Sequence, residues 1–147
     1  MAQTVFVNLP VGDVGRARRF YLALGFGLDE RFSGEQSACM VVSPEIFLML
    51  LARERFAEFA PRPVGDPARE TSVLVALSRD SHEAVEAFMA AGLAAGGTDT
   101  GQVQEQEGAM YGRALSDPDG NVLEVLWMDV AKMAPTLPDE MDLAVEA

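Results

Sequence analysis

Hydrophobic residues in the first half of the chain recur first with the period of a strand and then with that of a helix. Residues 5–9 form a short run rich in β-branched and aromatic side chains, which is typical of a strand. Apolar side chains then recur at helical spacing between Asp13, a favourable N-cap residue, and Gly25, a residue type that commonly ends helices. Apolar runs bounded by turn residues predict three more strands, at residues 28–32, 38–42 and 46–51.

The second half repeats this order about 67 positions later, with Asp80 in the place of Asp13. A strand is predicted at residues 73–77. The helix after it is predicted to begin at Asp80, which forms a capping-box pattern with Glu83, and to end at Gly92.

A hairpin closes the second half. One strand ends near Ser116, the turn Asp-Pro-Asp-Gly-Asn at 117–121 reverses the chain, and residues 122–128 return as a strand. The segment 96–108 is polar and rich in glycine, and we expect it to be either a mobile flap over a cleft or an inert surface loop.

Each half therefore has the order β-α-β-β-β, which predicts an α+β fold built from two tandem modules. We expect one domain over residues 1–130, with module 1 at about 4–52 and module 2 at about 71–130. The segment 53–70 is a predicted linker, because it holds several prolines and no period except that of a helical turn around Phe56 and Phe59. Residues 131–147 are predicted to be an acidic C-terminal tail.

Charge and composition narrow the possible partners. The chain has 11 Lys and Arg against 23 Asp and Glu, a net charge of −12, which disfavours nucleic acid and anionic membrane surfaces. No apolar run is long enough to span a bilayer, and no export signal is visible. The single cysteine, Cys39, favours a reducing cytoplasm, and we expect it to be a buried strand residue.

Two stretches resemble the vicinal oxygen chelate superfamily, which includes the glyoxalase I, bleomycin-resistance and extradiol dioxygenase families. They are "FVNLPVGDVGRARRFYLALGF" at 6–26 and "MYGRALSDPDGNVLEVLWMD" at 110–129. Their combination also looks like the subgroup labelled "lactoylglutathione lyase related". The resemblance implies modules whose mixed sheets curl around a cleft, and it implies that a homodimer is common.

The resemblance also implies four metal-ligand positions, and three of them are replaced here. They fall on Phe6, on Val73 or Leu74, and on Met49, whereas only Glu124 matches a family ligand. A catalytic metal ordinarily needs about three protein ligands. We therefore expect no cofactor and no metal site, although a divalent metal on a different set of residues stays an alternative.

If the Glu124 face lines the cleft, as the resemblance implies, the pocket is mainly apolar and suits a small organic ligand. Glu124 is the candidate catalytic residue, because a carboxyl group in apolar surroundings suits a general acid or base. Its alternative role is a structural pair with an arginine or a backbone donor. The sequence does not decide which way Tyr111 and Arg113 face. The candidate ligand-binding residues are Phe6, Asn8, Met49, Leu74, Met110, Tyr111, Arg113 and Leu126.

Two other features have ordinary structural interpretations. His82, the only histidine, is expected to be exposed at the start of the second helix. The arginines Arg16, Arg18 and Arg19 are more simply a solvated helix face than an anion site.

Three functions fit these observations. The first is a protein that binds a small organic molecule without metal. The second is a metal-dependent lyase or isomerase of the glyoxalase type, or an extradiol dioxygenase. The third is a metal-independent enzyme in which Glu124 acts as acid or base and Asn8 or Arg113 polarises the substrate.

Overall fold

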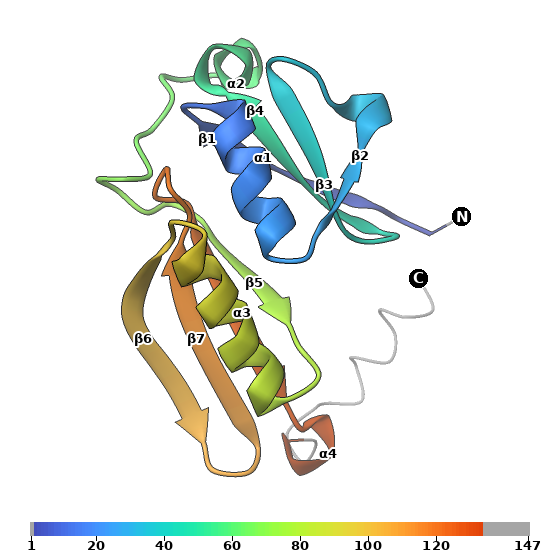
Figure 1. Cartoon of the computed structure of the whole chain (residues 1–147), viewed down its shortest axis with the longest axis vertical. Coiled ribbons are helices and arrows are strands. Elements are labelled where there is room, and N and C mark those ends of the chain that lie inside the picture. Colours follow the sequence, from blue (N-terminus) through green and yellow to red (C-terminus); the bar gives the residue numbers. More distant parts are fainter. Residues whose placement is uncertain (1, 134–147) are drawn as a thin grey trace.

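The computed structural model describes residues 2–133, which form two four-stranded mixed sheets, each covered by one long helix (Figure 1). The first sheet has the strand order β1-β4-β3-β2, and the second has the order β5-β8-β7-β6. The elements of the first module are β1 (Val5–Val11), α1 (Val14–Ala23), β2 (Gly27–Asp29), η1 (Glu30–Phe32), β3 (Ser37–Ser43) and β4 (Ile46–Ala52). Those that follow are α2 (Arg53–Phe59), β5 (Leu74–Ser78), α3 (His82–Ala94), β6 (Thr98–Gln106), β7 (Met110–Ser116), β8 (Val122–Met128) and α4 (Val130–Met133).

The two sheets have the same topology. β1 pairs in parallel with β4, and β5 pairs in parallel with β8, while the other neighbours are antiparallel. The predicted α+β fold of two tandem β-α-β-β-β modules is therefore confirmed. The predicted tail beyond residue 133 lies outside the described residues. Within residues 2–133, every helix is too short or too polar to cross a membrane.

The helix boundaries are as predicted in the first module and differ in the second. Asp13 caps α1 by accepting from the Arg16 N–H at 3.0 Å, and Gly25 follows the helix with a φ of 99°. In α3 the capping residue is Ser81, not Asp80; its hydroxyl accepts from the Ala84 N–H at 3.0 Å.

Gly92 does not end α3, contrary to the prediction. The helix continues to Ala94, and Gly96, with a φ of 109°, takes the role of Gly25. Gly92 is instead a close-packing position inside the helix, because a Cβ there would collide with the side chain of Leu115 on β7. The helix α3 is therefore about one turn longer than α1, which the sequence repeat of about 67 residues does not reveal.

The sequence predicts a flap or a surface loop at segment 96–108. This prediction is wrong, because most of the segment is the strand β6. This strand pairs along its length with β7, with a register shift between Asp99 and Val103. All nine of its residues are exposed, so it lacks the apolar alternation by which strands are recognised. At residues 28–32 the predicted strand is longer than the observed one, because β2 ends at Asp29. The Asp29 carboxylate accepts from the Arg31 N–H and starts a 3₁₀ turn there.

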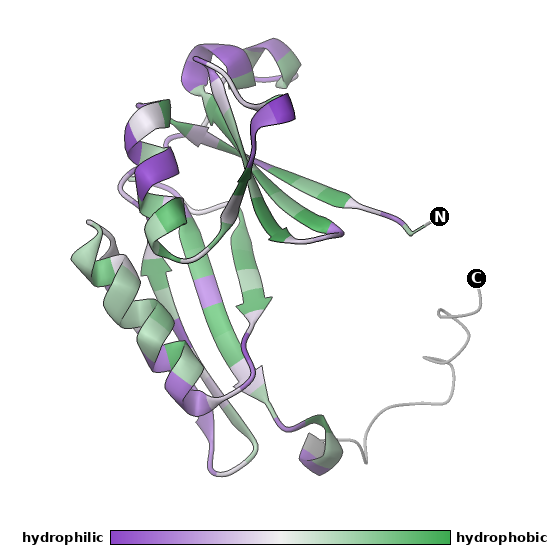
Figure 2. Ribbon diagram, turned by 45° about the vertical axis from the view of Figure 1, so that its right-hand side comes forward, coloured by the Kyte–Doolittle hydropathy of each residue, from purple (hydrophilic) through white to green (hydrophobic). Residues whose placement is uncertain are grey.

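The core lies between each sheet and its helix, and it is continuous across both modules. Figure 2 shows strands that are mostly hydrophobic, with polar residues gathered on exposed parts of the helices. Phe26 of module 1 and Phe88 of module 2 meet with ring centroids 6.3 Å apart. The guanidinium group of Arg79 lies over both rings, 5.8 Å and 4.8 Å from their centroids.

A buried polar cluster also joins the modules, and it is centred on the turn 117–121. The Tyr21 hydroxyl of α1 donates to Asp117 Oδ2 at 2.7 Å, and both side chains are buried. Asp117 Oδ1 accepts from the N–H groups of Asp119 and Asn121, each at 2.9 Å. The Asn121 side chain donates to Asp117 Oδ2 at 3.0 Å and to the Pro10 carbonyl of β1 at 3.1 Å.

A second contact of the turn is more exposed. Asp119 Oδ1 accepts from the Gly12 N–H and from the Arg16 guanidinium, both at 2.8 Å. Of the three arginines expected to be solvated, Arg16 therefore has a structural partner. Burial raises the pKa of Asp117, although the hydrogen bonds from Tyr21 and Asn121 act in the opposite direction.

Replacing Tyr21 by phenylalanine is expected to lower the free energy of unfolding by about 1–3 kcal/mol, because Asp117 then loses a buried donor. Urea denaturation of wild type and variant measures the difference. Tyr111→Phe is the matched control: its hydroxyl donates to Glu86, whose side chain is 42% exposed, so water can replace the donor. Equal losses in the two variants would contradict a special role for the buried cluster.

Candidate functional site

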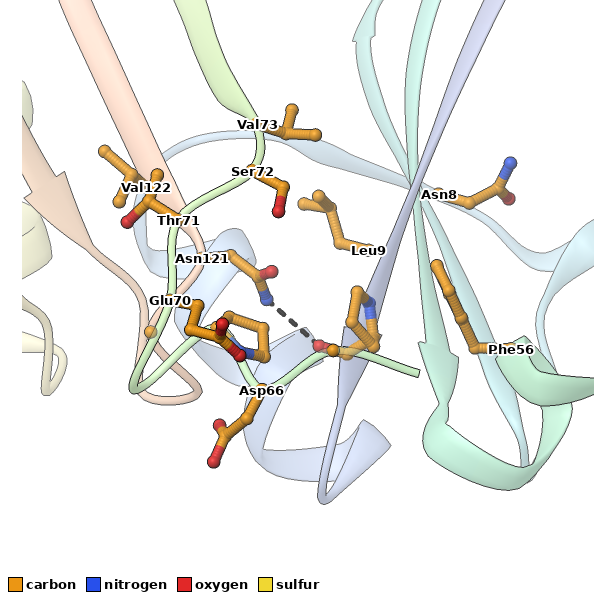
Figure 3. A pocket seen from close by; sticks show the side chains of 14 residues that line it. Asn8, Leu9, Phe56, Asp66, Glu70, Thr71, Ser72, Val73, Asn121 and Val122 are labelled. Atoms are coloured by element: carbon orange, nitrogen blue, oxygen red, sulfur yellow. Dashed lines mark hydrogen bonds between the residues drawn. The ribbon is translucent and has the colours of Figure 1, made fainter. Parts of the chain in front are cut away.

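A cavity of about 230 Å³ lies between the two modules, where the segment 60–73 runs between β1 and the start of β8 (Figure 3). We call it the linker pocket. Its walls come from the inner edge of β1, from α2, from the linker itself and from the turn before β8. The lining residues are Asn8, Leu9, Pro10, Phe56, Gly65, Asp66, Pro67, Glu70, Thr71, Ser72, Val73, Gly120, Asn121 and Val122.

The lining combines an apolar surface with a few hydrogen-bonding groups, which is typical of small-molecule sites. Leu9, Phe56, Val73 and Val122 supply apolar walls. The amides of Asn8 and Asn121 and the hydroxyls of Thr71 and Ser72 supply donors and acceptors. Asp66 and Glu70 are the charged residues of the lining, so the pocket is acidic.

Local contacts hold the linker wall in place. Arg53 of α2 donates to the Gly65 carbonyl at 2.9 Å and to the Val64 carbonyl at 3.2 Å. Asp66 Oδ1 accepts from the Ala68 N–H at 3.0 Å. Gly120 lies directly against the linker, because a Cβ built on it would be 2.6 Å from backbone atoms of Ala68.

The open face of the first sheet, which is the face turned away from α1, carries three of the predicted site residues. Phe6 is 46% exposed and stacks on Phe47 of β4, with ring centroids 4.7 Å apart and planes at 11°. Asn8 lies beside Met49 in the register of β1 and β4. These side chains form an apolar platform next to the linker pocket, to which Asn8 also contributes.

The open face of the second sheet carries Glu124, Leu126, Leu74 and Met110. Glu124 lies between Ala76 of β5 and Ala114 of β7 in the strand register. Leu126 lies beside Gly112, and Leu74 is 56% exposed beside Val122. Met110 lies at the far end of this face, beside Met128.

Two residues that sequence reasoning missed lie next to Glu124. Gln102 and Gln104 of β6 border a hollow of about 30 Å³ together with Gly112, Glu124 and Leu126. The signal was the Gln-Val-Gln alternation at 102–104, which indicates two side chains on one face if the segment is a strand. The polar, glycine-rich composition of segment 96–108 indicates a flap or a surface loop instead.

Tyr111 and Arg113, whose facing the sequence leaves open, lie on the helix face of the second sheet, although Arg113 also borders the hollow beside Glu124. They pair with Trp127 and Val125 in the register, which alternate with Glu124 along β8. Both side chains bind Glu86 of α3, the Tyr111 hydroxyl as a donor and Arg113 Nη1 at 2.8 Å; Arg113 also pairs with Asp99. The hydrogen bond from Tyr111, together with the charge of Arg113, lowers the pKa of Glu86.

His82 is exposed at the first position of α3, as predicted, and its ring stacks on Tyr111 with centroids 3.8 Å apart. It belongs to the helix face of the second sheet and is remote from Glu124 in the strand register. Cys39 is buried on β3, also as predicted.

The strands on either side of Glu124 bring no second acid, histidine or cysteine next to it. Between residues 2 and 133, no group of three or more His, Cys, Asp and Glu side chains is placed to hold a metal ion. The flanking positions Ala76 and Ala114 have no ligand atoms in their side chains. The superfamily resemblance assigns the other ligand positions to Phe6, to Val73 or Leu74, and to Met49, whose side chains offer only hydrocarbon or thioether groups.

Comparison with known proteins agrees with this architecture. The sequence profile of the bleomycin resistance protein-like N-terminal family matches residues 3–43. No curated protein sequence matches the chain significantly.

Three solved structures illustrate the structural similarity. A glyoxalase-related enzyme from Fulvimarina pelagi has a TM-score of 0.74 and 21% identity over 88% of this chain and 91% of that one. A glyoxalase/bleomycin resistance protein/dioxygenase family enzyme from Burkholderia phytofirmans has a TM-score of 0.70 and 22% identity over 86% and 99%. A bleomycin resistance determinant encoded on the transposon Tn5 has a TM-score of 0.59 and 21% identity over 87% and 99%.

The fold is that of the vicinal oxygen chelate superfamily, which confirms the resemblance stated from the sequence motifs. Within that superfamily, the first strand-helix-strand portion of the chain is similar to bleomycin resistance proteins. Because the structural matches are distant in sequence, they establish the fold and leave the activity to be inferred from the site.

Gly120→Ala is expected to displace the linker from the turn and to lower the free energy of unfolding by about 1–3 kcal/mol, because the new methyl group meets Ala68 and the φ of 99° disfavours a side chain. Trypsin should then cut more rapidly after Arg69 in the linker. Gly34→Ala is the control, because its new Cβ would meet no atom within 4 Å. Unchanged proteolysis and stability in Gly120→Ala would show that the linker does not depend on this contact.

Proposed function

We propose that the protein binds a small organic molecule non-covalently and without a metal, in the linker pocket and along the adjoining open faces of the sheets. The observation that carries this proposal is the linker pocket: a preformed cavity of about 230 Å³ with apolar walls and a few polar groups. The stacked Phe6 and Phe47 rings next to it would offer a platform for a planar or apolar ligand.

The alternatives have less support from the residues. A glyoxalase-type or dioxygenase reaction needs a metal centre with about three protein ligands, and among the described residues no group of three His, Cys, Asp and Glu side chains is placed to hold one. An acid/base reaction at Glu124 has less support from Arg113, one of its two candidate polarising groups, because Arg113 Nη1 and Nη2 bind Glu86 and Asp99. Binding requires neither of these features. We also propose a cytoplasmic location, in keeping with the buried free thiol of Cys39.

The binding proposal is tested by titrating the protein with the apolar fluorescent dye N-phenyl-1-naphthylamine. We expect saturable binding that EDTA does not change. Val73→Asp should weaken it about tenfold, or about 1.4 kcal/mol, because it places a charge on an exposed wall of the linker pocket. Val130→Asp, at a 61% exposed position on α4, is the matched control.

Three outcomes would contradict the proposal. If the dye does not bind saturably, the proposal that the protein binds apolar organic molecules of this kind is wrong. Equal effects of Val73→Asp and Val130→Asp on dye affinity would exclude the linker pocket as the binding site. Loss of binding in EDTA, with recovery on adding a divalent metal, would favour the metal-dependent alternative.

We further propose that two copies of the chain associate through the open faces. These faces and their edges expose large apolar side chains, which in proteins of this size commonly mark an interaction surface. The exposed fractions are 50% for Val5, 46% for Phe6, 56% for Leu74 and 43% for Met128.

Sedimentation equilibrium should therefore give twice the chain mass of 15.8 kDa at micromolar concentration. Phe6→Asp should shift the equilibrium to the monomer, because it puts a charge into the shared apolar surface. Phe59→Asp makes the same change at a 65% exposed position on α2 and should leave the dimer intact. A monomeric wild type, or equal behaviour of the two variants, would refute this association.

A further inference from the structure

The hollow beside Glu124 exists because Gly112 has no side chain. A Cβ on Gly112 would lie 3.3 Å from Leu126 Cβ and 3.9 Å from Gln104 Cβ, so an alanine would fill most of the space between β6 and β8. The hollow measures about 30 Å³. A cavity needs about 10–15 Å³ of such accessible space to hold one water molecule, so the hollow has room for a small polar group.

Three hydrogen-bond acceptors border this hollow. Glu124, Gln102 and Gln104 line it, and each side chain has at least one acceptor oxygen, in the carboxylate of Glu124 and the carboxamides of the two glutamines. In the part of the chain that the structure describes, none of these three side chains makes a hydrogen bond or an ion pair. Arg113 also borders the hollow; its Nη1 and Nη2 atoms bind Glu86 and Asp99 on the other face, and its buried Nε has no hydrogen-bond partner among the described residues.

We propose that this hollow receives the primary ammonium group of an organic amine whose apolar body lies along β8 toward the linker pocket. A primary ammonium has three N–H donors and no acceptor, which matches the three acceptor groups. A quaternary ammonium has no N–H to donate. The inference rests on the proposed ligand-binding function and specifies its ligand class.

The distance along β8 between the linker pocket and the hollow matches the length of such a ligand. Val122 lines the linker pocket, and Glu124 borders the hollow. The two residues are two positions apart on one strand, so their side chains lie on the same face about 7 Å apart along it. A ligand with a short apolar arm between an aromatic body and an amine spans this distance. The net charge of −12 would also favour the approach of a cation.

The test compares 3-phenylpropylamine with its neutral analogue 3-phenylpropan-1-ol and its N,N,N-trimethylated derivative by isothermal titration calorimetry. We expect wild type to bind the primary amine at least tenfold more tightly than the other two compounds. Glu124→Gln should lower the affinity for the amine to that for the alcohol, and it should leave the affinity for the alcohol unchanged. Glu105→Gln is the control for charge, since Glu105 is exposed on β6 and pairs with Tyr111 in the register of the other face.

Gly112→Ala tests the hollow itself and should also remove the preference for the amine, with Gly34→Ala as its control. If Gly112→Ala does not fold, Glu124→Gln still decides the question. Equal binding of amine and alcohol to wild type would overturn the ammonium site and leave the binding function standing. Equal losses in Glu124→Gln and Glu105→Gln would reduce the preference to general charge attraction. If none of the three compounds binds, both proposals fail for this ligand class.

Discussion

The interaction on which the rest of the structure depends is the buried contact between Tyr21 and Asp117. It links the helix of one module to the closing turn of the other, and it is surrounded by donors that satisfy the remaining lone pairs of the carboxylate. A buried carboxylate is costly unless it is hydrogen-bonded in this way. The contact is therefore specific: it is favourable only when the two modules have one relative position, and that position sets the width of the linker pocket.

The same turn also builds part of the site. Asn121 bonds to Asp117 with its side chain, bonds to Pro10 of the other module, and lines the linker pocket. Gly120, its neighbour, is the surface against which the linker packs. Stability and binding are thus coupled through residues 117–121: a change that loosens the turn would alter the junction of the modules and the wall of the pocket together. This coupling explains why the turn must do more than reverse a hairpin.

The sequence predicted those parts of the molecule whose signal is local. The duplicated order of elements, the Asp13 cap and the apolar helix faces were evident from spacing. β6 was missed because an exposed edge strand with polar residues on both faces has no apolar period. Gly92 was misassigned because a glycine required for close packing against Leu115 resembles one that ends a helix. The facing of Tyr111 and Arg113 could not be predicted, because the side of a sheet depends on strand register, which the sequence alone leaves open.

Register also decides which carboxylates remain free for a ligand. On the helix face of the second sheet, Arg113 forms ion pairs with Glu86 and Asp99, and these carboxylates neutralise its charge. On the open face, Glu124 meets only alanines on its neighbouring strands. A shift of one residue between β7 and β8 would bring these two sets together and leave no unpaired carboxylate in the cleft. The alternation of the strands therefore separates a closed structural network from an acidic group kept open beside an apolar surface.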